Sequence, residues 1–239
     1  MTPQPRRPER PSRRLPGLLA LLGPVALAAV EVLAVEVRPC AGQPVEVAGD
    51  TAHAEEVCAA SLAALEQLAT LGLAPAQPIR IVLVEQGILH GSGLAYGQYD
   101  GGRNRLELMS PRAIAAQQPA PTQFGRAIDG VIYAGLVAHE LTHAIAQQHK
   151  RVESLGHAAQ EYLAYAVEIA SLPDAVREAV IATAGVAGWE SGDSISTVYL
   201  GLNVHRFAVK SYLHLHDHPA PKSVVEAVLG SRAWVFTAP

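Results

Sequence analysis

The chain has 239 residues, 49% of them hydrophobic, and its 18 basic and 22 acidic side chains leave a net charge of −4. This balance disfavours nucleic acid or an anionic membrane surface as the partner, because both attract strongly basic proteins. The length suits a short leader followed by one domain with a full hydrophobic core.

The N-terminal segment has the three parts of a secretory signal peptide. Five arginines fall within residues 1–14, an apolar stretch covers residues 15–30, and small residues offer cleavage after Ala28 or Ala34. We therefore expect residues 1–34 to be a signal peptide.

A retained membrane anchor is the alternative to cleavage. Gly23-Pro24 interrupts the apolar stretch, which is also short for a span of about 20 residues. Cleavage would remove five arginines and two glutamates and leave a mature chain, residues 35–239, with a net charge of −7. That chain is expected to be periplasmic or secreted, without a stable membrane span.

Both cysteines, Cys40 and Cys58, lie just after the leader. An even number of cysteines in an exported protein predicts one disulfide, which would connect the first strand to the first helix. Two free, buried thiols are the alternative.

Turn residues and hydrophobic periodicity predict strands first and helices afterwards. Strands are expected at 45–47 and 78–84, and a hairpin at 93–99 and 104–108. Residues 111–121 are expected to form a loop, and helices are expected at 51–71, 174–184, 203–216 and 223–229, besides two helices that carry the motifs below. The first helix should bury Val57, Leu62, Leu65 and Leu68. This order predicts one α+β domain over 35–239, with a small N-terminal mixed sheet packed on a helical half.

Residues 139–143 form a complete His-Glu-x-x-His motif, His139-Glu140-Leu141-Thr142-His143. Two histidines four positions apart lie on one helix face, so both imidazoles can reach one metal ion. Residues 131–138 are apolar on nearly every face, which predicts a buried helix. Imidazole and carboxylate groups in such a helix would be costly to bury without a partner, and a metal ion supplies one. The motif predicts Zn²⁺ as the cofactor, with Glu140 facing a zinc-activated water.

A catalytic zinc usually takes a third protein ligand. His149 lies ten residues after His139, the spacing of the long metzincin motif, but Ala146 replaces the glycine of that motif. If the helix continues, His149 lies about 15 Å along the axis from His139 and cannot share its metal.

Glu161 is the favoured third ligand. A second helix, with Ser154 as its N-cap and its end before Pro173, could run antiparallel to the first and return Glu161 to the histidines. Small residues would allow close approach of the two helices: Ala158, Ala159 and Ala164. Glu168, seven positions after Glu161, remains the other candidate.

The His-Glu-x-x-His motif followed by Glu161-x-x-Ala164 resembles the gluzincin zinc metallopeptidases, in particular the M48-like peptidases and the minigluzincins. In those proteins a glutamate on a following helix completes the zinc site. The resemblance rests on specific motif residues over 131–168 and only on the order of strands and helices elsewhere. It departs at Tyr165, where the family has an aspartate that orients a ligand. The wider pattern also resembles an exported bacterial family without an assigned substrate.

The resemblance implies hydrolysis of a peptide or protein substrate by a zinc-activated water, with Glu140 as general base. It also implies a sheet edge that pairs with the substrate, here the hairpin around Tyr99. His205 is the expected oxyanion donor, because such donors lie downstream of the ligands. Three tyrosines are alternatives for that role: Tyr165, Tyr199 and Tyr212.

Two other functions fit the same residues. The chain could be a non-catalytic, zinc-stabilised exported module that binds a partner, or a zinc hydrolase of a non-peptide amide. A protein side chain in the fourth zinc position would favour the binding module. The histidines within residues 214–218 are better explained as a polar helix end, where cationic side chains suit the helix dipole, than as a second metal site.

Overall fold

The computed structural model describes residues 36–90, 93–233 and 235–239. The expected signal peptide and its cleavage positions after Ala28 and Ala34 lie outside the described residues. Within the described ranges, no helix is long and apolar enough to cross a membrane.

A five-stranded mixed sheet forms the N-terminal part, in the order β1-β2-β3-β7-β6. The three central strands are parallel, and β1 and β6 pair antiparallel at the two edges. In β3, the buried residues Ile79, Ile81 and Leu83 alternate with the exposed Arg80, the pattern of a strand with one face on the core. The strands are β1 Val37–Pro39, β2 Val45–Gly49, β3 Ile79–Val84, β6 Gly97–Asp100 and β7 Arg105–Met109.

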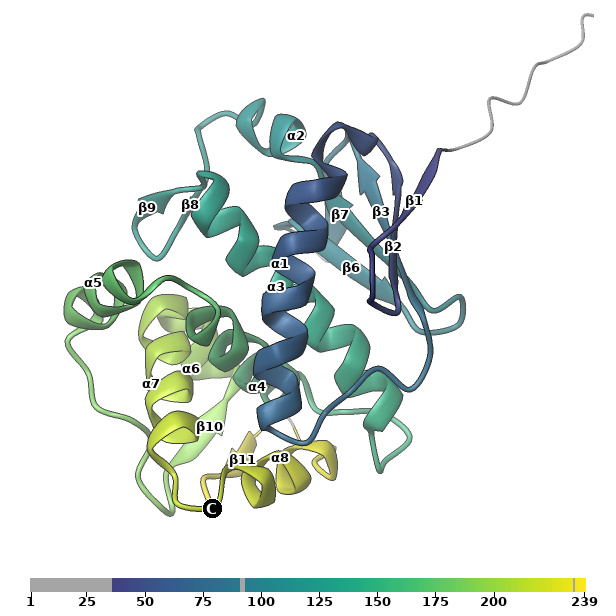
Figure 1. Ribbon diagram of the computed structural model, residues 1–239. Helices are drawn as coiled ribbons and strands as arrows, with labels where there is room; N and C mark the ends of the chain where they lie inside the picture. The colour runs from purple at the N-terminus through teal and green to yellow at the C-terminus, as the bar shows by residue number, and fades with distance from the viewer. Residues whose placement is uncertain (1–35, 91–92, 234) are drawn as a thin grey trace, which may run out of the picture. The chain divides into compact units, whose positions relative to one another are not determined.

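Helices make up most of the regular structure in the rest of the described chain. They are α1 Ala54–Thr70, α2 Pro111–Ala115, α3 Gly130–His149, α4 His157–Ala170, α5 Asp174–Ala184, α6 Thr197–Leu202, α7 Val204–Asp217 and α8 Pro221–Leu229. Figure 1 shows α3 between the sheet and the C-terminal helices α5 and α7. α3 packs on α1 and α4, and α4 packs on α7. The α+β prediction is confirmed. The two helices that carry the motifs, α3 and α4, lie in the middle of this fold.

Several short elements were not predicted. Residues 111–121 contain α2, because Ser110 caps it by accepting a hydrogen bond from the Ala113 amide at 3.0 Å and Pro111 occupies its first turn. The predicted hairpin strand 93–99 is two strands. Three pairs of two- or three-residue strands are also present: β4 Ile88–His90 with β5 Gly93–Ala95, β8 Thr122–Gln123 with β9 Arg126–Ala127, and β10 Ser194–Ser196 with β11 Val235–Thr237.

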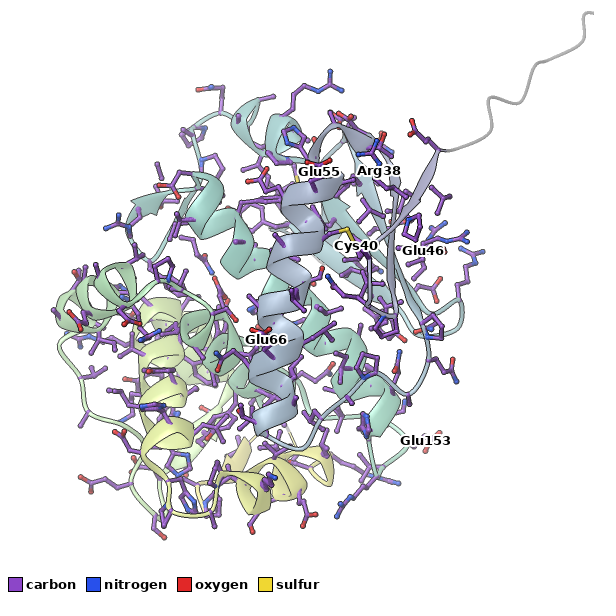
Figure 2. All side chains as sticks on the ribbon, in the orientation of Figure 1. Arg38, Cys40, Glu46, Glu55, Glu66 and Glu153 are labelled. Carbon is purple, nitrogen blue, oxygen red and sulfur yellow. A yellow bond between two sulfur atoms is a disulfide. The ribbon has the colours of Figure 1, made fainter. Side chains whose placement is uncertain are left out.

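The predicted buried stripe of α1 is wrong at Leu62, which is 46% exposed. Small residues form much of the true buried face, together with Val57 and Leu68. Leu62 lies one turn before Glu66, which is also exposed and is labelled on α1 in Figure 2. Counting only large apolar residues missed this face, because alanines let α1 pack closely on its neighbours.

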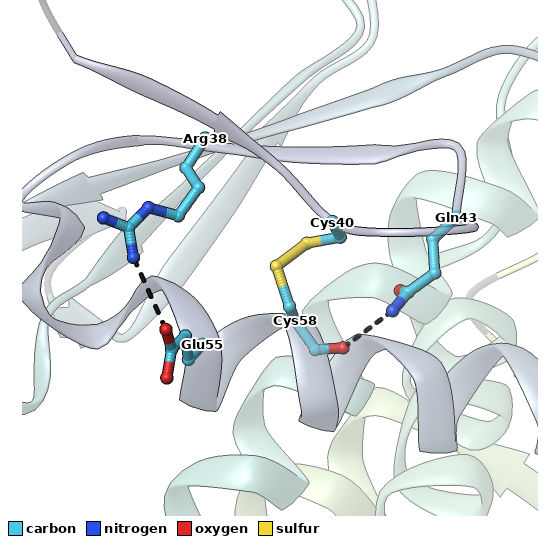
Figure 3. The surroundings of a disulfide bond; sticks show 5 residues. All are labelled: Arg38, Cys40, Gln43, Glu55 and Cys58. Atoms are coloured by element: carbon cyan, nitrogen blue, oxygen red, sulfur yellow. Dashed lines mark hydrogen bonds and ion pairs between the residues drawn. A yellow bond between two sulfur atoms is a disulfide. The ribbon is translucent and has the colours of Figure 1, made fainter.

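The predicted disulfide joins Cys40, just after β1, to Cys58 in α1, with a Cα–Cα distance of 5.3 Å. Figure 3 shows two further links beside it. Gln43 Nε2 donates to the Cys58 carbonyl at 3.1 Å, and the Arg38 guanidinium lies 3.8 Å from the Glu55 carboxylate. The disulfide therefore ties the edge of the sheet to the helix that covers it.

Replacing Cys40 and Cys58 together by alanine is expected to destabilise the fold. The bridge closes a loop with a sequence separation of 18, for which the chain-entropy model gives about 3 kcal/mol. In a domain of this size such a loss lowers the melting temperature by about 6–12 °C. Thermal unfolding monitored by circular dichroism measures the shift, and an unchanged midpoint would show that the bridge contributes no net stability.

Candidate metal centre

α3 positions the two histidines of the motif on its buried face. The helix begins after Asp129, whose carboxylate accepts from the Ile132 amide at 3.0 Å, and continues without a break to His149. His149 Nε2 donates to the Ala74 carbonyl at 2.6 Å. The structure thus places His149 away from His139, as expected for a continuous helix, and removes it as a third ligand.

α4 brings Glu161 to the two histidines. The N-cap of α4 is Gly156 rather than the predicted Ser154. Nitrogen or oxygen atoms of His139, His143 and Glu161 all lie within 4.8 Å of one another, and this is the group of potential metal ligands found among the described residues. The three side chains form the candidate metal centre.

The donor atoms of this centre lie close enough together to hold one metal ion. The two imidazole Nε2 atoms are 3.1 Å apart, His139 Nε2 is 3.5 Å from Glu161 Oε2, and His143 Nε2 is 3.4 Å from Glu161 Oε1. Zinc bonds of about 2.0–2.1 Å in tetrahedral geometry place ligand atoms about 3.3–3.4 Å apart. Each histidine Nε2 lies at about this distance from a different oxygen of the Glu161 carboxylate, so the three side chains together offer the ligands for one ion.

Glu168 orients the first histidine. Its Oε2 accepts from His139 Nδ1 at 2.9 Å, and its Oε1 accepts from Gln123 Nε2 at 3.0 Å. A proton on Nδ1 leaves the lone pair on His139 Nε2, which faces the centre. Glu168 is therefore not the third ligand, although the sequence left it as a candidate.

The orienting role of Glu168 replaces the aspartate that the resemblance would place at position 165. Glu168 follows Glu161 by seven residues, so both lie on the same face of α4. Gly135 on α3 makes room for it, because a Cβ at Gly135 would lie 3.3 Å from Glu168 Cγ. The sequence shows the seven-residue spacing, but it does not show that Gln123, on the β8–β9 hairpin, donates to Glu168.

Glu140 lies against the edge strand β6. Its side chain is only 8% exposed, and it borders the same cavity as the candidate ligands. A Cβ on Gly97 would lie 2.5 Å from Glu140 Cγ and 2.8 Å from its Oε2. Gly97 therefore allows the carboxylate to sit directly beneath the strand.

The electrostatics of the centre favour a bound cation. Burial raises the pKa of the Glu140 carboxyl, and charge on His139 and His143 opposes this rise. At Glu161, burial alone would raise the pKa, but His143 and His139 outweigh it and hold the pKa well below its usual range. Burial alone would lower the pKa of His139, but Glu161 and Glu168 raise it well above its usual value. The carboxylates thus stabilise positive charge at this point.

A cavity of about 440 Å³ opens over the centre. The segment 94–99 forms one wall, and α3 and α4 form the others. The hairpin around Tyr99 does supply a sheet edge, because β6 is the last strand of the sheet and pairs only with β7 within it.

The structure does not bring His205 to the cavity. Its Nε2 donates to the Val180 carbonyl at 2.9 Å, and its ring lies against Phe124 with centroids 5.5 Å apart. Of the tyrosine alternatives, Tyr165 lines the cavity, with its ring edge-on to His139 at a centroid distance of 4.5 Å. The other two lie elsewhere: Tyr199 contacts the Trp189 ring, and Tyr212 stacks on His216.

Replacing Glu168 by glutamine is expected to weaken metal binding about 10–100-fold, because the neutral amide holds the His139 proton less firmly. Competition of a zinc chelator with the purified chain measures the change. Glu178→Gln is the control, because Glu178 is exposed on α5. Equal zinc affinity in wild type and Glu168→Gln would contradict the orienting role.

The fold and the site define an α+β protein with a candidate metal centre of two histidines and one glutamate. The chain belongs to a family of unknown function, DUF6639, which matches residues 45–238 and so includes the whole centre. No curated protein matches the chain significantly, and neither does any solved structure. The chemistry of the centre is therefore the basis for inferring a function.

Proposed function

We propose that the chain is an exported zinc metallopeptidase that hydrolyses peptide bonds at the centre formed by His139, His143 and Glu161. The observation that carries this proposal is the approach of the two imidazole Nε2 atoms and the Glu161 carboxylate to within 3.1–3.5 Å of one another, with the Glu140 carboxylate beside them. Two imidazoles and one carboxylate form a common ligand set of zinc peptidases. Export is supported by the Cys40–Cys58 disulfide, since disulfides persist in oxidising compartments.

The bound ion would lower the pKa of water toward about 7 and polarise a peptide carbonyl. Glu140 accepts a proton from the attacking water and delivers it to the leaving amine, so that one water is consumed for each peptide bond broken. Burial of Glu140 keeps competing solvent away from this transfer. Tyr165, rather than His205, takes the role of hydrogen-bond donor to the developing oxyanion, because it lines the cavity beside His139.

The edge strand β6 supports a peptide as the substrate. Its outer edge leaves backbone groups free to pair with an extended segment, and the cavity lies beside this edge. The binding-module alternative would be favoured by a protein side chain in the fourth position of the centre. Among the described residues, the ligand group contains three side chains, which favours an open position for substrate.

The test is hydrolysis of fluorescein-labelled casein by the purified chain loaded with one equivalent of zinc. We expect cleavage that is lost on chelation with 1,10-phenanthroline and restored by added zinc. A chain that binds zinc but cleaves neither casein nor a mixed peptide library would overturn the peptidase proposal.

Replacing Gly97 by alanine is expected to lower kcat about 100-fold, because the new methyl group must push Glu140 out of position and a displacement of about 1 Å has such a cost. Zinc content should be unchanged, because the three atoms nearest the added Cβ all belong to Glu140, which is not one of the three ligands. Gly101→Ala, at the tip of the adjoining hairpin, is the control. Full activity in Gly97→Ala would show that Glu140 does not need its place beneath β6.

A further inference from the structure

The two ends of the cavity can be assigned to the two ends of α3. Gly97 lies over Glu140, and Tyr99 donates through its hydroxyl to Asn104, which in turn accepts from Gln148. The segment 94–99 therefore runs alongside α3 in the same sense, so the residues before Gly97 lie toward the N-terminal end of that helix. The candidate metal centre divides the cavity into two ends.

Apolar side chains line the end that precedes Gly97. Leu94 and Ala95 come from β5, Tyr96 from the link between β5 and β6, Leu136 from α3, and Tyr165 from α4. Leu94 is 42% exposed although it borders the cavity. An exposed leucine beside a cavity of this kind offers contact area to a ligand rather than to the protein core.

The β4–β5 hairpin extends this apolar end outward. Leu89 lies directly opposite Leu94 in the register of the two strands and is 81% exposed. Directly opposite residues in an antiparallel pair have neighbouring side chains on one face. The two leucines therefore form an apolar pair at the rim of the cavity.

Polar side chains, three of them glutamines, line the other end. Gln147 on α3 donates to Gln160 on α4 at 2.7 Å, and Gln98 and His157 border the same region. No lysine or arginine occurs among the described residues that line the cavity, whereas Glu140 and Glu161 do line it. Away from the metal centre, a carboxylate on a ligand would find no lysine or arginine to pair with.

We propose that this cavity selects internal peptide segments with a large apolar side chain on one side of the cleaved bond and an uncharged polar side chain on the other. Leu94, with Leu89 beside it, is the specificity-determining residue of the apolar side. A free C-terminal carboxylate is disfavoured because the lining has no lysine or arginine to bind it. This inference rests on the proposed peptidase function and names its substrate class.

The test measures binding rather than turnover, with the zinc-loaded Glu140→Gln chain and fluorescein-labelled, end-capped hexapeptides. The peptides carry leucine, serine or aspartate at one central position and glutamine at the next. Fluorescence anisotropy should show that the leucine peptide binds about tenfold more tightly than the serine peptide, since burial of one such side chain has at least this effect. The aspartate peptide should bind most weakly.

Adding Leu94→Ser and Leu89→Ser to that chain should remove the tenfold preference for leucine. Leu202→Ser is the matched control, because Leu202 on α6 is 80% exposed but does not line the cavity. Zinc content and the melting temperature should be the same in all three chains, since exposed leucines contribute little to stability.

The outcomes separate this inference from the proposed function. If wild type cleaves casein but the leucine, serine and aspartate peptides bind equally, or the preference survives Leu94→Ser with Leu89→Ser, the specificity inference is wrong and the peptidase proposal stands. If the zinc-loaded chain neither cleaves casein nor binds any of the peptides, both are wrong.

Discussion

Replacing Glu140 by glutamine is expected to lower kcat about 100- to 10,000-fold, the usual contribution of a general base. The amide has the same shape as the carboxylate but cannot accept the proton of the attacking water. It also fits the same space beneath Gly97, so the fold should be unchanged. Because Glu140 is not among the three donors of the centre, zinc should remain bound at about one ion per chain.

The measurement combines the rate of casein hydrolysis with elemental analysis of the same samples. Glu153→Gln is the matched control, because Glu153 is exposed in the connection between α3 and α4, where Figure 2 labels it. Loss of activity together with loss of zinc would assign Glu140 to metal binding. A Glu140→Gln chain that cleaves casein at the wild-type rate would show that the mechanism proposed for this residue is wrong.

Local signals in the sequence were sufficient to predict the long elements. α5 begins and ends where the pattern of residues 174–184 predicts, and Asn203 caps α7 by accepting from the Arg206 amide at 2.9 Å. Such caps and periodic apolar positions act within one or two turns, so one segment reveals them. The short strands depend instead on pairing with distant segments, as β10 does with β11, and a run of three residues carries no periodicity.

The ligands of the centre could be predicted from the sequence, whereas the groups that orient them could not. His139 and His143 follow from a spacing within one helix, and Glu161 follows from the length of an antiparallel helix pair. The role of Glu168 depends on Gln123, which is 45 residues away in sequence and reaches it from a hairpin. Contacts of this kind are set by tertiary packing, which the sequence pattern does not encode locally.

His205 illustrates the limit of reasoning from order along the chain. It lies downstream of the ligands, as the resemblance requires, and α7 does pack against α4. Its imidazole, however, binds the Val180 carbonyl of α5. The rotation of α7 about its own axis decides which side chain faces the cavity, and that rotation follows from buried contacts such as Phe207 and Val209, which are fully buried on the same helix.

Replacing Glu161 by alanine is expected to remove zinc from the purified chain. Structural zinc sites with four ligands bind with about 10–16 kcal/mol, so the loss of one ligand weakens binding by about 3 kcal/mol, or ~100-fold or more. No other carboxylate in the described chain is placed to substitute. Glu168 is held by His139 Nδ1 and Gln123, and Glu140 lies beneath Gly97.

Elemental analysis of wild type and Glu161→Ala, each reconstituted with zinc and then dialysed, measures this effect. Wild type should retain about one zinc per chain, whereas the variant should retain much less. Glu66→Ala is the control for a lost surface carboxylate, since Glu66 is exposed on α1. A variant that keeps its zinc would still have a metal site at the two histidines, but Glu161, whose oxygens lie 3.4–3.5 Å from their Nε2 atoms, would then have to serve substrate binding rather than coordination.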